Sequence, residues 1–254
     1  MPLVTFTSDY GLQDHYVAAV KAKILSDDTT TQIIDVSHLV NPLDVAHGAF
    51  IIKNVYQDFP KGSIHFIAVG TTAAQCDRFI VAEIDEHFFV APDNGILSMI
   101  SNGEKLKASL ISENVKDSFP AKNIMAEAVF KLRTHKSLDV FNNSFLDYKE
   151  TKNRIASFKD DNISGHIIHI DYYGNAITNI SEDIFHAVRH DRGYTISFKR
   201  ENINRIYHSY NEVGEADCVI LFNAANLLEI AIKQGSAYQL LGLRFGDAVN
   251  IQFQ

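Results

Sequence analysis

The start of the chain constrains the fold most strongly. Residues 4–8 are mostly apolar or β-branched, residues 9–15 are mostly polar and include Gly11, and apolar side chains then recur at helical spacing from Tyr16 to Ile24. This pattern predicts a strand, a loop and a helix. In an open α/β sheet the loop after a strand opens into the crevice where ligands bind.

Two carboxylates, Asp9 and Asp14, lie in this predicted loop. A carboxylate there can accept hydrogen bonds from a vicinal diol such as a ribose, or pair with an ammonium group. Asp14 can instead cap the following helix, which is a common use of aspartate. The pattern alone leaves both roles open.

Strand and helix alternate through the first half of the chain. The expected elements are strands over residues 32–37, 63–69, 79–84 and 87–91, a helix that begins at Asp44, and a helix over 122–133. Such alternation is typical of an α/β domain with a mainly parallel sheet, and the strands over 79–84 and 87–91 are expected to form a hairpin.

A polar stretch over residues 147–162 is the candidate domain boundary. Beyond it the chain has short strand-like runs with little helix between them. We therefore predict an α/β domain over residues 1–150, a linker over 151–162 and a small all-β, barrel-like domain over 163–254.

Composition excludes several classes of protein. The chain has 254 residues and a formal net charge of −8, so no global basic field attracts a phosphate backbone and we expect no nucleic-acid partner. It has only two cysteines and lacks an apolar run of the ~18 residues that a membrane span needs. We therefore predict a cytoplasmic protein with reduced thiols and no membrane segment.

Common catalytic and metal-binding motifs are absent from the sequence. It has no nucleophile elbow, no phosphate-binding P-loop and no dinucleotide-binding glycine motif. The eleven histidines are scattered, and although His186 and His190 are one helical turn apart, no third ligand lies near them in the sequence. We predict no metal site.

Residues 170–180 bring a carboxylate, an aromatic ring and an amide together, at Asp171, Tyr173 and Asn175. These groups can pair with an ammonium, stack on a flat heterocycle and hydrogen-bond to its edge. The same residues suit a plain hairpin whose turn is Gly174-Asn175, and on their own they favour that interpretation.

Five motifs in a fixed order give these segments a common interpretation. They lie at residues 7–14, 35–38, 91–95, 170–180 and 223–237. Over nearly the whole chain they resemble the S-adenosylmethionine (SAM) hydroxide adenosyltransferase family, relatives of fluorinase and chlorinase. The resemblance implies an α/β amino-terminal domain and a β-barrel carboxyl-terminal domain in a homotrimer, with SAM between one subunit's first domain and its neighbour's second. It leaves open whether trimers pair into a hexamer.

The resemblance also implies a reaction and a set of binding residues. In that family water or halide attacks C5′ of SAM, and methionine leaves; SAM is the substrate and no cofactor is needed. By position the resemblance assigns Asp9 to the ribose hydroxyls, Asp14 and Asp171 to the methionine ammonium, Tyr173 and Tyr210 to the faces of adenine, and Asn175 and Gly235 to its edge. Asn223 falls where the halogenases hold the methionine carboxylate.

The chain departs from the family at the reacting centre. The hydrolases orient hydroxide with an Asp, an Arg and a His; here the Asp position is Gly70, the His position is Pro120, and only Arg78 remains, with Asp77 beside it. Gly70 and Pro120 cannot transfer a proton from a side chain. The hydroxyl donors of the halogenases fall at Gly70, Ala73 and Ala121, so the resemblance does not support halide capture.

Two hypotheses from different classes follow. The chain is a hydrolase that cleaves SAM to adenosine and methionine, with Arg78 and Asp77 or Lys122 orienting water, or it is a non-catalytic binder or sensor of SAM or another 5′-substituted adenosine. Transfer to a different, bulkier nucleophile is a third possibility. We favour the hydrolase, because positioning and desolvation alone can supply part of a rate enhancement.

Overall fold

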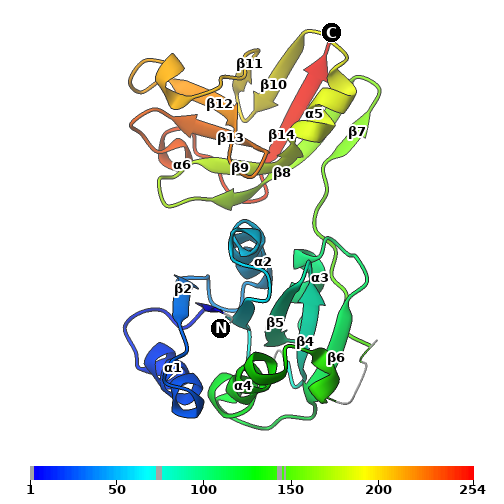
Figure 1. Cartoon of the computed structure of the whole chain (residues 1–254). Helices are drawn as coiled ribbons and strands as arrows, with labels where there is room; N and C mark the ends of the chain where they lie inside the picture. Colours follow the sequence, from blue (N-terminus) through cyan, green and yellow to red (C-terminus); the bar gives the residue numbers. More distant parts are fainter. Residues whose placement is uncertain (1–2, 73–75, 142–144, 146) are drawn as a thin grey trace. The chain divides into compact units, whose positions relative to one another are not determined.

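The computed structural model describes residues 3–72, 76–141, 145 and 147–254. The chain forms two compact units, Met1–Asn153 and Arg154–Gln254 (Figure 1). Each unit has its own sheet and its own hydrophobic core.

The first unit is built on a six-stranded sheet of order β2-β1-β3-β5-β4-β6. Its strands are β1 (Val4–Ser8), β2 (Ile33–Ser37), β3 (Ile64–Ala68), β4 (Phe79–Ile84), β5 (His87–Pro92) and β6 (Lys107–Ser112). Neighbours from β2 to β5 are parallel, and β4 is antiparallel to β5 and β6. The predicted mainly parallel sheet is confirmed, as is the hairpin, whose turn residues Asp85 and Glu86 both have positive φ.

Helices cover both faces of this sheet (Figure 1). Helices α1 (Tyr16–Asp27) and α4 (Ala126–His135) lie on one face, and α2 (Val45–Lys53) and α3 (Ile96–Ile100) lie on the other. The segment η2 (Ala121–Met125) leads into α4. Two further short segments, η1 (Tyr56–Asp58) and η3 (Leu138–Phe141), follow α2 and α4. Alternate residues of β3 serve the two cores: Phe66 packs with α1 and α4, and Ile67 with α2 and α3. This two-residue period is what a strand buried on both faces requires.

The second unit is a curled antiparallel sheet of order β11-β10-β14-β8-β9-β13-β12, with β7 paired to β8. Its strands are β7 (Ser157–Lys159), β8 (Asn162–Ile170), β9 (Ala176–Ser181), β10 (Tyr194–Phe198), β11 (Glu201–Ile203), β12 (Cys218–Phe222), β13 (Leu227–Ile232) and β14 (Ala248–Phe253). Strand β8 pairs first with β7 and β14 and then with β9, so it joins the two halves of the sheet. Among the described residues the strand order does not return to its start, so the sheet curls without closing.

A helix in the second unit corrects the expectation that this part is all-β. Helix α5 (Glu182–Arg189) begins after Ser181, whose hydroxyl accepts a hydrogen bond from the Ile184 N–H at 3.3 Å. Phe185 and Val188 bury its apolar face in the core of the unit. The unit also contains the short segments η4 (Tyr210–Glu212) and α6 (Ala237–Leu240).

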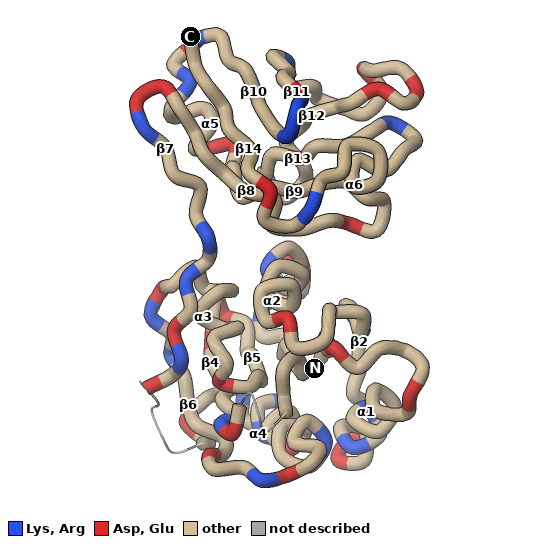
Figure 2. Tube along the Cα trace, turned by 180° about the vertical axis from the view of Figure 1, so that it is seen from behind, with Lys and Arg blue, Asp and Glu red and all other residues tan. Residues whose placement is uncertain are grey.

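Charged side chains of both signs are interspersed along the traces of both units (Figure 2). Within the described residues, no helix combines the length and the apolar character that crossing a membrane requires.

Candidate functional site

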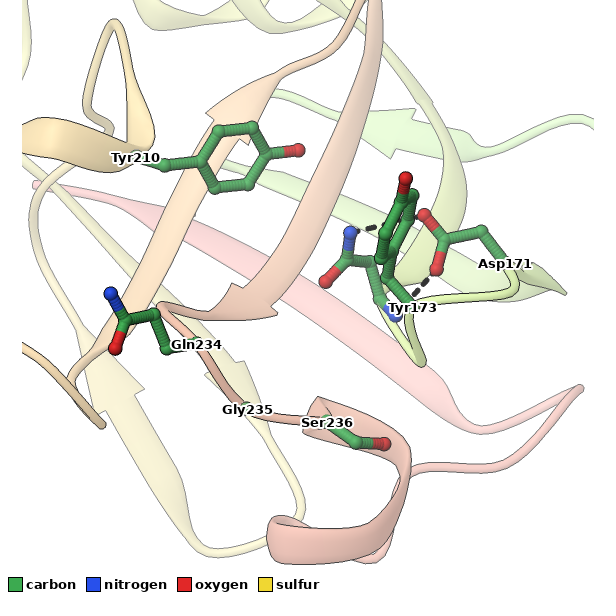
Figure 3. A pocket seen from close by; sticks show the side chains of 7 residues that line it. Asp171, Tyr173, Tyr210, Gln234, Gly235 and Ser236 are labelled. Atoms are coloured by element: carbon green, nitrogen blue, oxygen red, sulfur yellow. Dashed lines mark hydrogen bonds between the residues drawn. The ribbon is translucent and has the colours of Figure 1, made fainter.

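A pocket of about 650 Å³ lies in the second unit (Figure 3). Its lining residues are Asp171, Tyr173, Asn175, Tyr210, Gln234, Gly235 and Ser236. They come from the turn between β8 and β9, from the start of η4, and from the segment that joins β13 to α6. All except Gln234 and Ser236 are residues that the resemblance assigned to SAM, although they are distant in the sequence.

The turn between β8 and β9 is held by Asp171. One carboxylate oxygen accepts the backbone N–H of Asn175 at 2.8 Å and the other accepts its side-chain amide at 3.0 Å. Gly174 has a φ of +85° and donates its N–H to the Asp171 carbonyl at 3.0 Å. The hairpin is therefore right as local structure, but its turn is centred on Tyr172 and Tyr173 and not on the predicted Gly174-Asn175 pair. The same turn also forms one wall of the pocket, so the two interpretations are compatible.

These bonds fix what the turn can offer a ligand. Because the Asn175 amide nitrogen donates to Asp171, the orientation of the amide is set. Its Oδ1 has no hydrogen-bond partner among the described residues and is an acceptor available to a ligand N–H. Asp171 places a carboxylate at the pocket, and among the described residues no Lys or Arg lines it.

Two aromatic rings line the pocket. Tyr173 is 77% exposed and Tyr210 is 42% exposed, so both have ring surface that a ligand can cover. The Tyr210 hydroxyl donates to Glu229 on β13. Glu229 is only 4% exposed, and its sequence surroundings do not mark it as a functional residue. Burial, and then this bond to Glu229, raise the pKa of Tyr210. The phenol therefore stays protonated at neutral pH.

Asn223 takes part in the same network. Its amide nitrogen donates to Glu229 at 3.1 Å, and its Oδ1 accepts the backbone N–H groups of Ala225 at 2.9 Å and Leu227 at 3.2 Å. The side chain is thus engaged within the protein at both ends. It is not a lining residue of the pocket.

In the first unit, Asp9 lies at the carboxyl end of β1. Its Oδ2 accepts the backbone N–H of Leu43 at 2.9 Å and that of Gly70 at 3.1 Å. Asp9 therefore ties together the loops that follow β1, β2 and β3. Its other oxygen makes no hydrogen bond within the described residues, so it can accept one from a ligand.

Asp14 is exposed, and the capping alternative is not observed. The N-cap of α1 is His15, and no side chain makes a capping hydrogen bond there. Among the described residues, no hydrogen bond or ion pair engages the Asp14 carboxylate. Its role as a ligand for an ammonium stays a prediction.

Arg78 is bound by two carboxylates. Its guanidinium contacts Asp93 at 2.7 Å and Asp147 at 3.1 Å, and lies 5.2 Å from the ring centre of Phe145. Asp93 is buried, and this burial raises the pKa of its carboxyl group even though Arg78 opposes the shift. The neighbouring Asp77 is exposed.

The positions of the missing catalytic groups lie beside aromatic side chains. The Tyr10 hydroxyl and the Thr71 hydroxyl, which follows Gly70, are 3.0 Å apart, and the Tyr10 and Phe119 rings are 5.8 Å apart between centres. Pro120 follows Phe119 and is the N-cap of η2. Ala73 lies outside the described residues. Where the structure is described, no group of three or more His, Cys, Asp or Glu side chains is arranged to hold a metal ion.

Both units match the same protein family in comparisons with known proteins. The model of the SAM hydroxide adenosyltransferase N-terminal domain matches residues 4–142, and that of the C-terminal domain matches residues 165–250. A protein of Methanocaldococcus jannaschii named (R)-S-adenosyl-L-methionine hydrolase is 26% identical, over 99% of this chain and 96% of its own length. A fluorinase of Nocardia brasiliensis is 25% identical over 70% of this chain and 71% of its own length. The crystal structure of an uncharacterized conserved protein from Thermotoga maritima has a TM-score of 0.87 and 25% identity, covering 98% of this chain and 100% of that one.

Proposed function

Because the chain belongs to the SAM hydroxide adenosyltransferase family, we propose that it is a SAM hydrolase. Water attacks C5′ of SAM, the bond from C5′ to sulfur breaks, and the products are adenosine and L-methionine with release of one proton. Proteins named as SAM hydrolases match this chain along nearly its whole length. The observation that carries the proposal is the pocket of the second unit, because its lining combines aromatic rings, a fixed amide and a carboxylate.

In this proposal the pocket holds the adenosine part of SAM. Tyr173 and Tyr210 cover the adenine, and Oδ1 of Asn175 and the backbone near Gly235 contact its edge. Asp171 favours the cationic methionine part of SAM, since the lining that the structure describes has a carboxylate and no basic side chain.

Asp9 completes the proposed site from the first unit. Its free oxygen accepts a hydrogen bond from a ribose hydroxyl, and Asp14 pairs with the methionine ammonium. We propose a homotrimer in the cytoplasm, in which Asp9 and Asp14 are supplied to the pocket by a neighbouring subunit.

The reaction makes small demands on acid–base groups. The sulfonium leaves as a neutral thioether, so no proton has to be donated to the leaving group. The protein has to orient one water molecule in line with the bond to sulfur and remove its other hydrogen-bond partners. We assign this orientation to Arg78 and Asp77. Bulk water takes the proton, because Gly70 and Pro120 stand where the family has an Asp and a His.

The second candidate function is a binder or sensor of SAM. Arg78 favours it, because its two terminal nitrogens are already paired with Asp93 and Asp147. In that case the adenosine contacts are kept and the reaction is lost.

Product analysis distinguishes the two functions. The protein is incubated with excess SAM at neutral pH without added halide, and adenosine and methionine are measured by chromatography. A hydrolase gives both products in equal amounts over many turnovers, and Asn175→Ala lowers the rate, whereas Asn211→Ala, at an exposed position outside the pocket lining, does not. Saturable SAM binding without product would establish the binder and refute the hydrolase.

A further inference from the structure

The buried carboxylate of Glu229 lies on β13, outside the pocket lining. We propose that Glu229 is a positioning residue that fixes the ring of Tyr210 as one wall of the adenosine site. The inference rests on the proposed function, because it concerns the same pocket.

The surroundings of Glu229 leave it two hydrogen-bond donors. One oxygen accepts the hydroxyl of Tyr210, and the other accepts the amide of Asn223 at 3.1 Å. No Lys, Arg or His of the described residues forms an ion pair with it. A buried carboxylate without a counter-ion is costly unless it is hydrogen-bonded. Both donors are therefore held strongly in place.

The fixed orientation of the Asn223 amide determines which group donates and which accepts in this network. Its Oδ1 accepts two backbone N–H groups, from Ala225 and Leu227, so the amide cannot turn over without losing both bonds. Its nitrogen must then point at Glu229. Glu229 in turn has one oxygen left, which is occupied by the hydroxyl of Tyr210. The backbone thus determines the position of the tyrosine through two side chains.

Tyr210 needs this support. It begins η4, a segment of three residues, and its side chain is 42% exposed. In Figure 3 its ring points toward the pocket, with the hydroxyl at the far end. Since the hydroxyl is occupied by Glu229, Tyr210 offers the ligand its ring and not its hydroxyl. A ring held in the bound orientation avoids the entropy cost of ordering a side chain on binding.

The test is a double-mutant cycle read out by adenosine affinity. Calorimetric titrations with adenosine are made on the unchanged protein, Tyr210→Phe, Glu229→Gln and the double variant. Tyr210→Phe keeps the ring and loses the bond. Glu229→Gln replaces the carboxylate oxygen that faces Tyr210 with an NH₂ group, which leaves only a weaker, reversed hydrogen bond to the phenol oxygen. Each substitution is expected to weaken binding about three- to tenfold. The double variant is expected to bind no more weakly than Tyr210→Phe alone. Glu215→Gln, at an exposed position of the same unit, is the matched control and binds as the unchanged protein does.

The coupling separates positioning from a general effect on stability. If Glu229 acts only on the stability of the unit, Glu229→Gln lowers affinity by the same factor in the Tyr and Phe backgrounds, and the proposal is overturned. Should Glu229→Gln fail to fold, Tyr210→Phe decides alone: full affinity without the hydroxyl would overturn the proposal. Absence of both adenosine and SAM binding in the unchanged protein would refute the proposed function, and this inference with it.

Discussion

Asp9 has two tasks in this account, and two substitutions separate them. Its Oδ2 accepts the N–H groups of Leu43 and Gly70, and its other oxygen is left for the ribose. Asp9→Ala removes both tasks. Asp9→Asn keeps an oxygen that can accept both N–H groups, but it places an NH₂ group, a donor only, where the ribose hydroxyl needs an acceptor.

The magnitudes follow from the bonds that are lost. A hydrogen bond to a charged group contributes about 1.5–3 kcal/mol. Asp9 is half-buried, so we use the lower value and expect Asp9→Ala to lower the free energy of unfolding by about 3 kcal/mol for the two bonds. Asp9→Asn makes both bonds neutral and is expected to cost about 1 kcal/mol. Loss of the ribose contact is expected to weaken SAM binding about tenfold or more in both variants.

Urea denaturation and calorimetric titration measure the two quantities on the same samples. A ligand without the diol, 2′,3′-dideoxyadenosine, provides the control, because the unchanged protein and Asp9→Asn should bind it equally. If Asp9→Asn binds SAM as tightly as the unchanged protein does, the ribose contact is wrong. If Asp9→Ala is as stable as Asp9→Asn, the two backbone bonds do not hold the loops.

Three further predictions concern other parts of the chain. Burial lowers the pKa of His65 from 6.5 to about 3, so between these two pH values the unfolded state binds the proton and the folded state does not. By pH 5 this difference lowers the free energy of unfolding by about 2 kcal/mol. Thermal denaturation of His65→Leu should therefore show a flatter pH dependence than that of the unchanged protein, and an equally steep one would show that His65 is not the cause. Gly174→Ala adds a Cβ to a residue with positive φ, and this Cβ would clash with Ser236 in the pocket lining. Calorimetry should therefore find weaker adenosine binding, and unchanged affinity would show that the turn does not shape the pocket. Arg78→Ala leaves the buried Asp93 without its ion-pair partner and should lower the free energy of unfolding by about 3–5 kcal/mol. The double variant Arg78→Met with Asp93→Asn should be more stable in urea than Arg78→Ala, because it leaves no unpaired charge. The reverse order of stability would contradict a buried ion pair.

The sequence predicted most of the first unit, because its elements carry local signals. Strand β1 and helix α1 follow from the periodicity of their apolar residues, and the 79–91 hairpin from the Asp85-Glu86 turn. The cap of α1 was not predictable in this way. Asp14 is a good capping residue by type, but the helix begins one residue later, and no side chain caps it.

The missed features of the second unit have two different causes. Helix α5 had a local signal, because Ser181 at the cap and Glu182 and Asp183 in the first turn are favourable at a helix start. The strand-like runs on both sides of this segment nevertheless favoured the prediction of an all-β unit. Glu229 had none. It is an acidic residue within a strand. It meets Asn223 across the β12–β13 hairpin, and it meets Tyr210 because the bridge between Tyr207 and Leu221 places the segment before Tyr210 beside β12. Such networks depend on tertiary contacts that no short stretch of sequence encodes.

The central claim is that water attacks C5′ of SAM at this site. The most direct test is to run the reaction in water enriched in ¹⁸O and to determine the mass of the adenosine formed. We expect methionine and adenosine in equal amounts, with one solvent oxygen in each adenosine, at its 5′ position. Adenosine without the solvent oxygen, a 5′ adduct of another nucleophile, or no product would contradict it.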